Sequence, residues 1–229
     1  MKGFPLLLTS MSGSVGGLTF SHNRGGSYVR DRAVPTQPNT AFQAIVKGAF
    51  GTLSTAWSAS VTAIQRTAWE LYADNTPLVD KLGQSFIPTG LNMYIRGNTG
   101  LLQAEFARVD DGPVTFGLPT VAAIAVSSMS TATEIASITF DVNDPWVGDD
   151  DGYLFIFASR PQKPSIGFFK GPYQLAGTVA GDSTTPPTSP ASITVPFATV
   201  AGDRVFFRAT VIDGEGRKSA DQFFSILTT

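Results

Sequence analysis

The stretch RVFFRATV, residues 204–211, decides how the second half of this chain is interpreted. Val205, Phe207, Ala209 and Val211 alternate with Arg204, Phe206, Arg208 and Thr210. Apolar side chains at every second position are typical of a β-strand with one face buried in a core. The same alternation recurs over residues 136–142 and 193–197, so we expect several half-buried strands in this part of the chain.

Further segments complete this β-rich half. The continuous apolar run 153–158 predicts a central strand, and residues 121–126, 173–179 and 223–227 predict three others. About seven strands within residues 119–229 are typical of a small β-sandwich. Pro196 predicts that its strand lies at a sheet edge. The spacer GDSTTPPTSP, residues 181–190, predicts a loop or an extended crossover between sheets.

The first half has helical periodicity instead. Thr40 with Gln43, and Thr62 with Gln65, form capping-box patterns, and a third helix is expected to begin near Thr89. Trp57 and Trp69 are expected in the core between the first two helices. Inside these segments, Gly48 and Gly51 are interpreted as positions of close packing, whereas Gly97 and Gly100 are expected to weaken the third helix.

Residues 109–119 contain Asp, Gly and Pro in the pattern of a domain boundary. We therefore expect an α+β protein with three parts: a glycine-rich arm over residues 1–40, a helical module over 41–110, and an all-β immunoglobulin-like sandwich over 119–229.

The arm has few means of building a core of its own. Residues 12–32 read SGSVGGLTFSHNRGGSYVRDR, with five glycines and few large apolar side chains. Ordering glycine costs conformational entropy, so such a segment is expected to become ordered against a neighbour. Arginine and aromatic residues are enriched at protein interfaces. The expected interface residues of the arm are Phe20, Arg24, Tyr28, Arg30 and Arg32.

The composition disfavours several chemistries. The chain has no cysteine and a single histidine, His22, which has no local nucleophile or orienting carboxylate. The acidic residues at 141–151 do not have the spacing of an EF-hand loop, and we interpret them as a solvated loop, with a weak calcium site as the alternative. We expect no catalytic residues, metal or cofactor, although a pair of carboxylates within about 10 Å would revive glycoside hydrolysis.

Charge and hydropathy bear on the partners. Residues 1–108 hold nine Lys or Arg against five Asp or Glu, and residues 109–229 hold seven against thirteen. Neither half has the clustered basic patch expected of a nucleic-acid binder, so nucleic acid is disfavoured as a partner. No apolar run approaches the roughly 20 residues that span a bilayer, and we expect no membrane span.

Two segments resemble known families. SGSVGGLTFSHNRGGSYVRDRAVPTQPNTAFQ, residues 12–43, followed by LSTAWSASVTAIQRTAWELYA, residues 53–73, resembles the amino-terminal region of uncharacterised proteins from tailed-phage and prophage gene clusters. AGDRVFFRATVIDGEGRKSA, residues 201–220, is similar to the last hairpin of fibronectin type III domains. The long 181–190 spacer and the lack of a clear early core tryptophan depart from that second pattern.

The resemblance implies a virion structural protein of a tailed bacteriophage, either a capsid decoration or a tail or neck accessory. It would bind other virion proteins and copies of itself through the arm, project the sandwich, and have no small-molecule substrate. The alternative is an adhesin domain that binds carbohydrate or a cell surface, such as a host glycan, at Trp146 and Tyr153. Exposure of Trp146 would favour that alternative.

Overall fold

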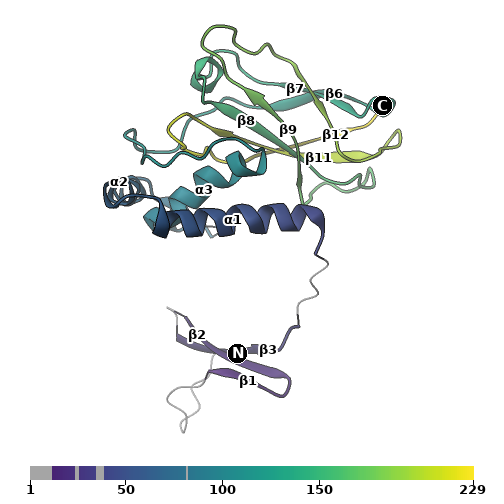
Figure 1. Ribbon diagram of the computed structural model, residues 1–229. Helices are drawn as coiled ribbons and strands as arrows, with labels where there is room; N and C mark the ends of the chain where they lie inside the picture. Colours follow the sequence, from purple (N-terminus) through teal and green to yellow (C-terminus); the bar gives the residue numbers. More distant parts are fainter. Residues whose placement is uncertain (1–11, 24–25, 35–38, 81) are drawn as a thin grey trace. The chain divides into compact units, whose positions relative to one another are not determined.

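The computed structural model describes residues 12–23, 26–34, 39–80 and 82–229, which combine α-helices with antiparallel β-sheets (Figure 1). The predicted mixed α+β class is confirmed. The chain divides into two compact units, residues 1–40 and residues 41–229. The division falls directly before the first helix.

The first unit is a three-stranded antiparallel sheet in the order β1 (Gly13–Val15), β2 (Leu18–Asn23) and β3 (Gly26–Asp31). Gly16 and Gly17 connect β1 to β2, and Gly16 has a φ of 56°, which glycine adopts without strain. The Arg32 N–H donates a hydrogen bond to the Gly17 carbonyl oxygen at 2.7 Å and extends the pairing beyond β3. The described part of the arm is therefore a small antiparallel sheet.

The second unit begins with three helices, α1 (Ala41–Ala59), α2 (Ala63–Asp74) and α3 (Gly90–Gln103), with the short pair β4 (Leu78–Val79) and β5 (Ser85–Phe86) between α2 and α3. The predicted capping box at α2 is confirmed. The Thr62 hydroxyl accepts from the Gln65 N–H at 3.3 Å, and the Gln65 side chain accepts from the Thr62 N–H at 2.8 Å. Thr89 caps α3, as predicted.

An aromatic cluster fills the space between the helices. Trp69, Tyr72 and Tyr94 are buried, and the Trp69 ring lies edge-on to Tyr94 with 5.6 Å between the centroids. Trp57 packs at the border of this cluster, 5.4 Å from the Tyr94 ring. The prediction that both tryptophans belong to the core is confirmed.

Seven strands after residue 119 form two antiparallel sheets (Figure 1). One sheet has the order β10–β7–β6, and the other has the order β12–β11–β8–β9. The edge position predicted for the strand near Pro196 is confirmed by β10. The bounds are β6 (Ala125–Ser130), β7 (Ile135–Thr139), β8 (Tyr153–Ala158), β9 (Gln174–Ala180), β10 (Ala191–Thr194), β11 (Arg204–Ile212) and β12 (Gln222–Leu227), with a short 3₁₀-helix at Pro145–Gly148.

The two sheets share the largest core of the protein. Ile138 of β7, Ile193 of β10 and Phe207 of β11 are buried in it. The alternating side chains of β11 that the sequence predicts to be buried all belong to this core. They are Val205, Phe207, Ala209 and Val211.

Strands β8 and β11 at the centre of the four-stranded sheet are covered on their second face as well. Phe155 and Phe157 of β8 and Ile212 of β11 pack there against Leu101 of α3. The apolar run of β8 is continuous because this central strand is covered on both faces. The prediction that β11 is buried on one face only is wrong. Phe206, on the second face, is 7% exposed.

The expected boundary segment, residues 109–119, packs closely against the helices. Trp69 Nε1 donates to the Asp110 carbonyl oxygen at 3.0 Å, and the Tyr94 hydroxyl donates to Asp110 Oδ1 at 2.9 Å. The Tyr72 hydroxyl donates to the Gly117 carbonyl oxygen at 3.2 Å. Residues 41–229 therefore form one compact unit that is not divided at this segment.

Asn98 fixes the start of the same segment. Its buried side-chain amide donates to the Val109 carbonyl oxygen at 3.0 Å and accepts from the Val109 N–H at 2.6 Å. We expect Asn98→Ala to lower the free energy of unfolding by about 2 kcal/mol, because both backbone groups lose their partner. Chemical denaturation measures this loss. An unchanged midpoint would contradict the role assigned to Asn98.

The glycines of α1 and α3 differ in their surroundings. A Cβ atom at Gly97 would lie 2.1 Å from the Gly216 carbonyl oxygen, and one at Gly100 would lie 2.9 Å from Ile212 Cδ1. At Gly48 and Gly51, apart from the backbone of α1 itself, no atom of the described residues would lie within 4 Å of an added Cβ atom. The close-packing interpretation of Gly48 and Gly51 is wrong, and it is the α3 glycines that permit a close approach.

Candidate interaction surfaces

The arm sheet has an apolar face. The strand register places Phe20 opposite Val29 and Leu18 opposite Val15, so these four side chains share one face. Val15 is 68% exposed, Leu18 44% and Val29 45%. Within the described part of the arm no second layer covers these residues.

The expected interface residues of the arm are divided between its two faces. Tyr28 and Arg30 alternate with Val29 and lie on the face opposite Phe20. Arg32 follows β3 and is exposed. Arg24 lies outside the described residues. The alternation of Leu18 with Thr19 and of Val29 with Arg30 is the signal that would have identified the apolar face.

Strand β3 lies at the edge of this sheet, beside β2 only. An edge strand presents unpaired backbone N–H and C=O groups, to which another chain can add a strand. The arm therefore offers a sheet edge and an apolar face together.

The acidic residues of 141–151 accept hydrogen bonds from backbone N–H groups. Asp144 accepts from Ala122 N–H at 3.1 Å, Asp149 from Gly214 N–H at 2.8 Å, and Asp150 from Ser183 N–H at 2.7 Å. The bond from Ser183 lowers the pKa of Asp150. These carboxylates join loops, so their role is more specific than that of a solvated loop. In the described ranges no three His, Asp or Glu side chains gather as metal ligands would.

The side chains expected at a glycan site do not form an open platform. Trp146 is 2% exposed and packs 5.2 Å from the Phe140 ring. Tyr153 stacks on Phe106 with 4.1 Å between ring centroids. The exposure of Trp146 that would favour an adhesin is not observed.

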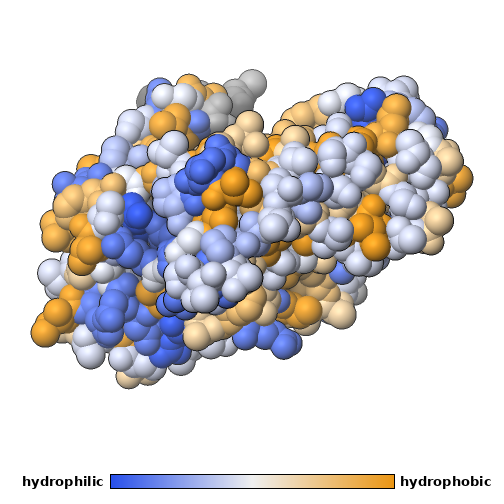
Figure 2. Space-filling view, turned by 90° about the horizontal axis from the view of Figure 1, so that it is seen from above, coloured by the Kyte–Doolittle hydropathy of each residue, from blue (hydrophilic) through white to orange (hydrophobic). Residues whose placement is uncertain are grey.

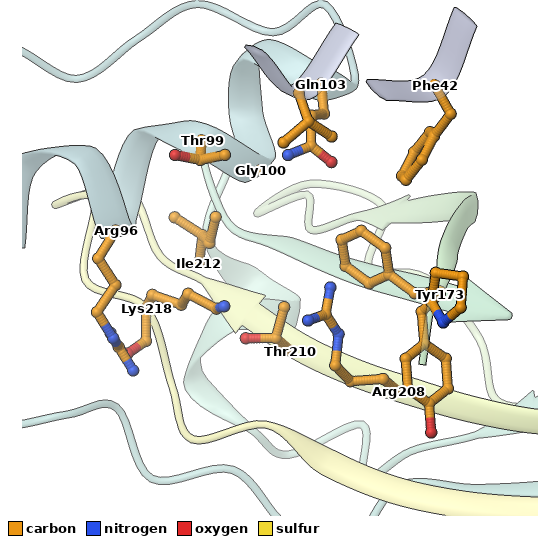
Figure 3. Close-up of a pocket in the computed structure, with 13 residues that line it drawn as sticks. Phe42, Arg96, Thr99, Gly100, Gln103, Tyr173, Arg208, Thr210, Ile212 and Lys218 are labelled. Atoms are coloured by element: carbon orange, nitrogen blue, oxygen red, sulfur yellow. The ribbon is translucent and has the colours of Figure 1, made fainter. Parts of the chain in front are cut away.

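A pocket of about 390 Å³ lies between α1, α3 and the second face of the four-stranded sheet. Figure 3 shows Lys218 and Arg208 directing their cationic groups toward Thr210 from opposite sides. Phe42 of α1 and Gln103 of α3 lie on the far wall of the same pocket. No local sequence pattern indicates this pocket, because its residues come from distant segments of the chain.

The pocket has an excess of positive charge. Asp221 lies 3.2 Å from Lys218 Nζ and 3.8 Å from Arg208 Nη1. Arg96 donates to the carbonyl oxygens of Lys218 and Ser219. Burial lowers the pKa of Lys218, and the cations of Arg96 and Arg208 lower it further while Asp221 raises it.

A separate aromatic groove of about 660 Å³ shares one lining residue, Tyr173, with this pocket. Phe168 and Phe223 in its wall are 79% and 64% exposed.

On the face shown in Figure 2, hydrophobic and hydrophilic residues are interspersed. Apolar side chains exposed singly in that manner carry no functional meaning.

Comparison of the chain with protein-family models, with curated proteins and with solved structures finds no match. Among the described helices, none is long and apolar enough to cross a membrane.

Proposed function

We propose that this protein is a non-enzymatic structural component of a tailed-phage virion that binds neighbouring subunits through its N-terminal arm. The observation that carries the proposal is the separate arm sheet, whose apolar side chains Val15, Leu18 and Val29 are exposed. The resemblance of residues 12–73 to phage and prophage proteins supports the virion setting.

The size of the arm sheet explains why it needs a partner. Ordering each residue costs about 1–2 kcal/mol of backbone entropy, and a three-stranded sheet gains stability mainly by burying an apolar face. A neighbouring virion subunit that covers Phe20 and Val29 supplies that burial. Strand addition at the β3 edge contributes main-chain hydrogen bonds to the same association.

The β-rich part of the second unit is proposed to be an immunoglobulin-like domain of the fibronectin type III kind. Support comes from the sheet composition, in which the first, second and fifth strands of this part form one sheet and the other four form the second. Such sandwiches place loops at their ends, which suits a module that projects from a particle. The capsid, neck and tail are all compatible sites for it.

Substitutions on the two faces of the arm test the proposed contact. Phe20→Ser combined with Val29→Ser should greatly reduce co-sedimentation with particles that lack the protein, because the apolar face loses its two paired side chains. Thr19→Ala on the opposite face is the matched control and should bind as the unmodified chain does. Equal sedimentation of the double variant and the control would contradict the contact.

A further inference from the structure

The pocket between α3 and the four-stranded sheet is built from three layers of the fold. Phe42 and Val46 come from α1, Thr99 and Gly100 from α3, and Phe157 from β8. Its volume of about 390 Å³ falls within the range of pockets that hold small organic ligands, roughly 300–1,000 Å³. The apolar lining and a few convergent polar groups are also typical of such sites.

Three cations line this pocket, and the described residues place one carboxylate in contact with them. Asp221 is shared between Lys218 and Arg208, so its single charge leaves two positive charges unmatched. Arg96 is held by backbone carbonyl oxygens, which orient its guanidinium and leave its charge in place. An anion entering the pocket would offset this excess.

One polar group of the pocket also lacks a partner. Arg208 Nε is buried and has no hydrogen-bond acceptor among the described residues. The guanidinium of Arg208 lies over the Phe157 ring, 4.1 Å from its centroid, and this contact holds it at the pocket wall. Buried donors nearly always have a partner, so an unpaired one beside a cavity indicates a missing acceptor.

We infer that this pocket binds the carboxylate of an organic acid that has an apolar or aromatic body. Arg208 and Lys218 hold the carboxylate, and the Thr210 side chain lies between them (Figure 3). The rings of Phe42 and Phe157 pack against the apolar body. This binding site is independent of the arm and of the proposed virion role.

Binding of 4-phenylbutyrate to the full chain tests the inference, with 4-phenylbutanol as the uncharged probe. Calorimetry or NMR titration should show the acid binding at least about tenfold more tightly than the alcohol, because charged hydrogen bonds contribute at least 1.4 kcal/mol. Equal binding of the acid and the alcohol, or no binding of the acid, would overturn the inference.

Matched variants locate the site. Lys218→Met and Arg208→Gln should each weaken acid binding at least about tenfold, since each removes one cation from the carboxylate. Arg160→Gln should leave it unchanged, because Arg160 lies over Phe197, away from the pocket lining. Thermal melting shows whether each variant is folded. Unchanged affinity of both folded pocket variants would overturn the assignment of the site.

The carboxylate could belong to a free acid or to an acidic side chain of a partner protein. The peptide acetyl-Leu-Glu-Phe-amide, compared with its Gln counterpart, separates these sources. Tighter binding of the Glu peptide than of 4-phenylbutyrate identifies a protein side chain as the ligand, and the reverse order identifies a free acid. Both results support the pocket as a carboxylate site.

Discussion

Replacing Gly97 by alanine should lower the free energy of unfolding by about 4 kcal/mol or more, which places this substitution among the most damaging in the chain. The added Cβ atom would lie 2.1 Å from the Gly216 carbonyl oxygen, whereas carbon and oxygen atoms in contact normally lie roughly 3.3–3.6 Å apart. The Cβ atom is bonded directly to the backbone and the carbonyl oxygen is part of the backbone, so no side-chain rotation relieves the overlap. Denaturant unfolding followed by circular dichroism measures the loss.

Gly51→Ala is the matched control for this substitution. Gly51 lies inside α1, and apart from the helix backbone no atom that the structure describes would lie within 4 Å of an added Cβ atom. Its replacement should raise the free energy of unfolding by up to about 1 kcal/mol, because alanine is the better helix former. If both variants shift the unfolding midpoint in the same direction, the close approach of α3 to residue 216 is not a feature of the folded protein.

These two glycines show what sequence periodicity can and cannot predict. Both sit in segments of helical spacing, and both carry the same intrinsic cost in a helix. The difference arises from a loop more than 100 residues away, which no local pattern reveals. Helical spacing alone therefore cannot distinguish the closely packed glycines of α3 from the open ones of α1.

The alternating pattern predicts the strands correctly, but it does not predict which strands are covered on both faces. The alternation along β11 identifies Val205 and Phe207 as core residues because one face of the strand meets a neighbouring sheet. It does not reveal that Phe206 is buried on the other face, since the covering groups come from other parts of the chain. Local alternation reports the period of a strand, and burial of the second face depends on tertiary packing.

The candidate sites were predicted in part. The glycine-rich arm was recognised from its composition, but its faces depend on a strand register that composition does not contain. The acidic residues were recognised as a cluster, and the backbone N–H groups that they bind could not be inferred from spacing. Arg96, Arg208 and Lys218 come together only because α3 packs on the sheet beside them.

Deletion of residues 1–40 should abolish incorporation into particles and leave the rest of the protein folded. Among the described residues, the hydrophobic clusters of 41–229 contain no side chain from the arm. The thermal unfolding midpoint of the truncated protein should therefore match that of the full chain. Incorporation should fall to background, because the apolar face and sheet edge that are proposed to contact the neighbour are gone.

The most direct test is co-sedimentation of full-length and truncated protein with assembled particles that lack the protein. The arm-mediated account predicts that the full chain sediments with the particles and that the folded 41–229 fragment stays in the supernatant. Equal sedimentation of the two would contradict the account, because the contact would then lie within residues 41–229.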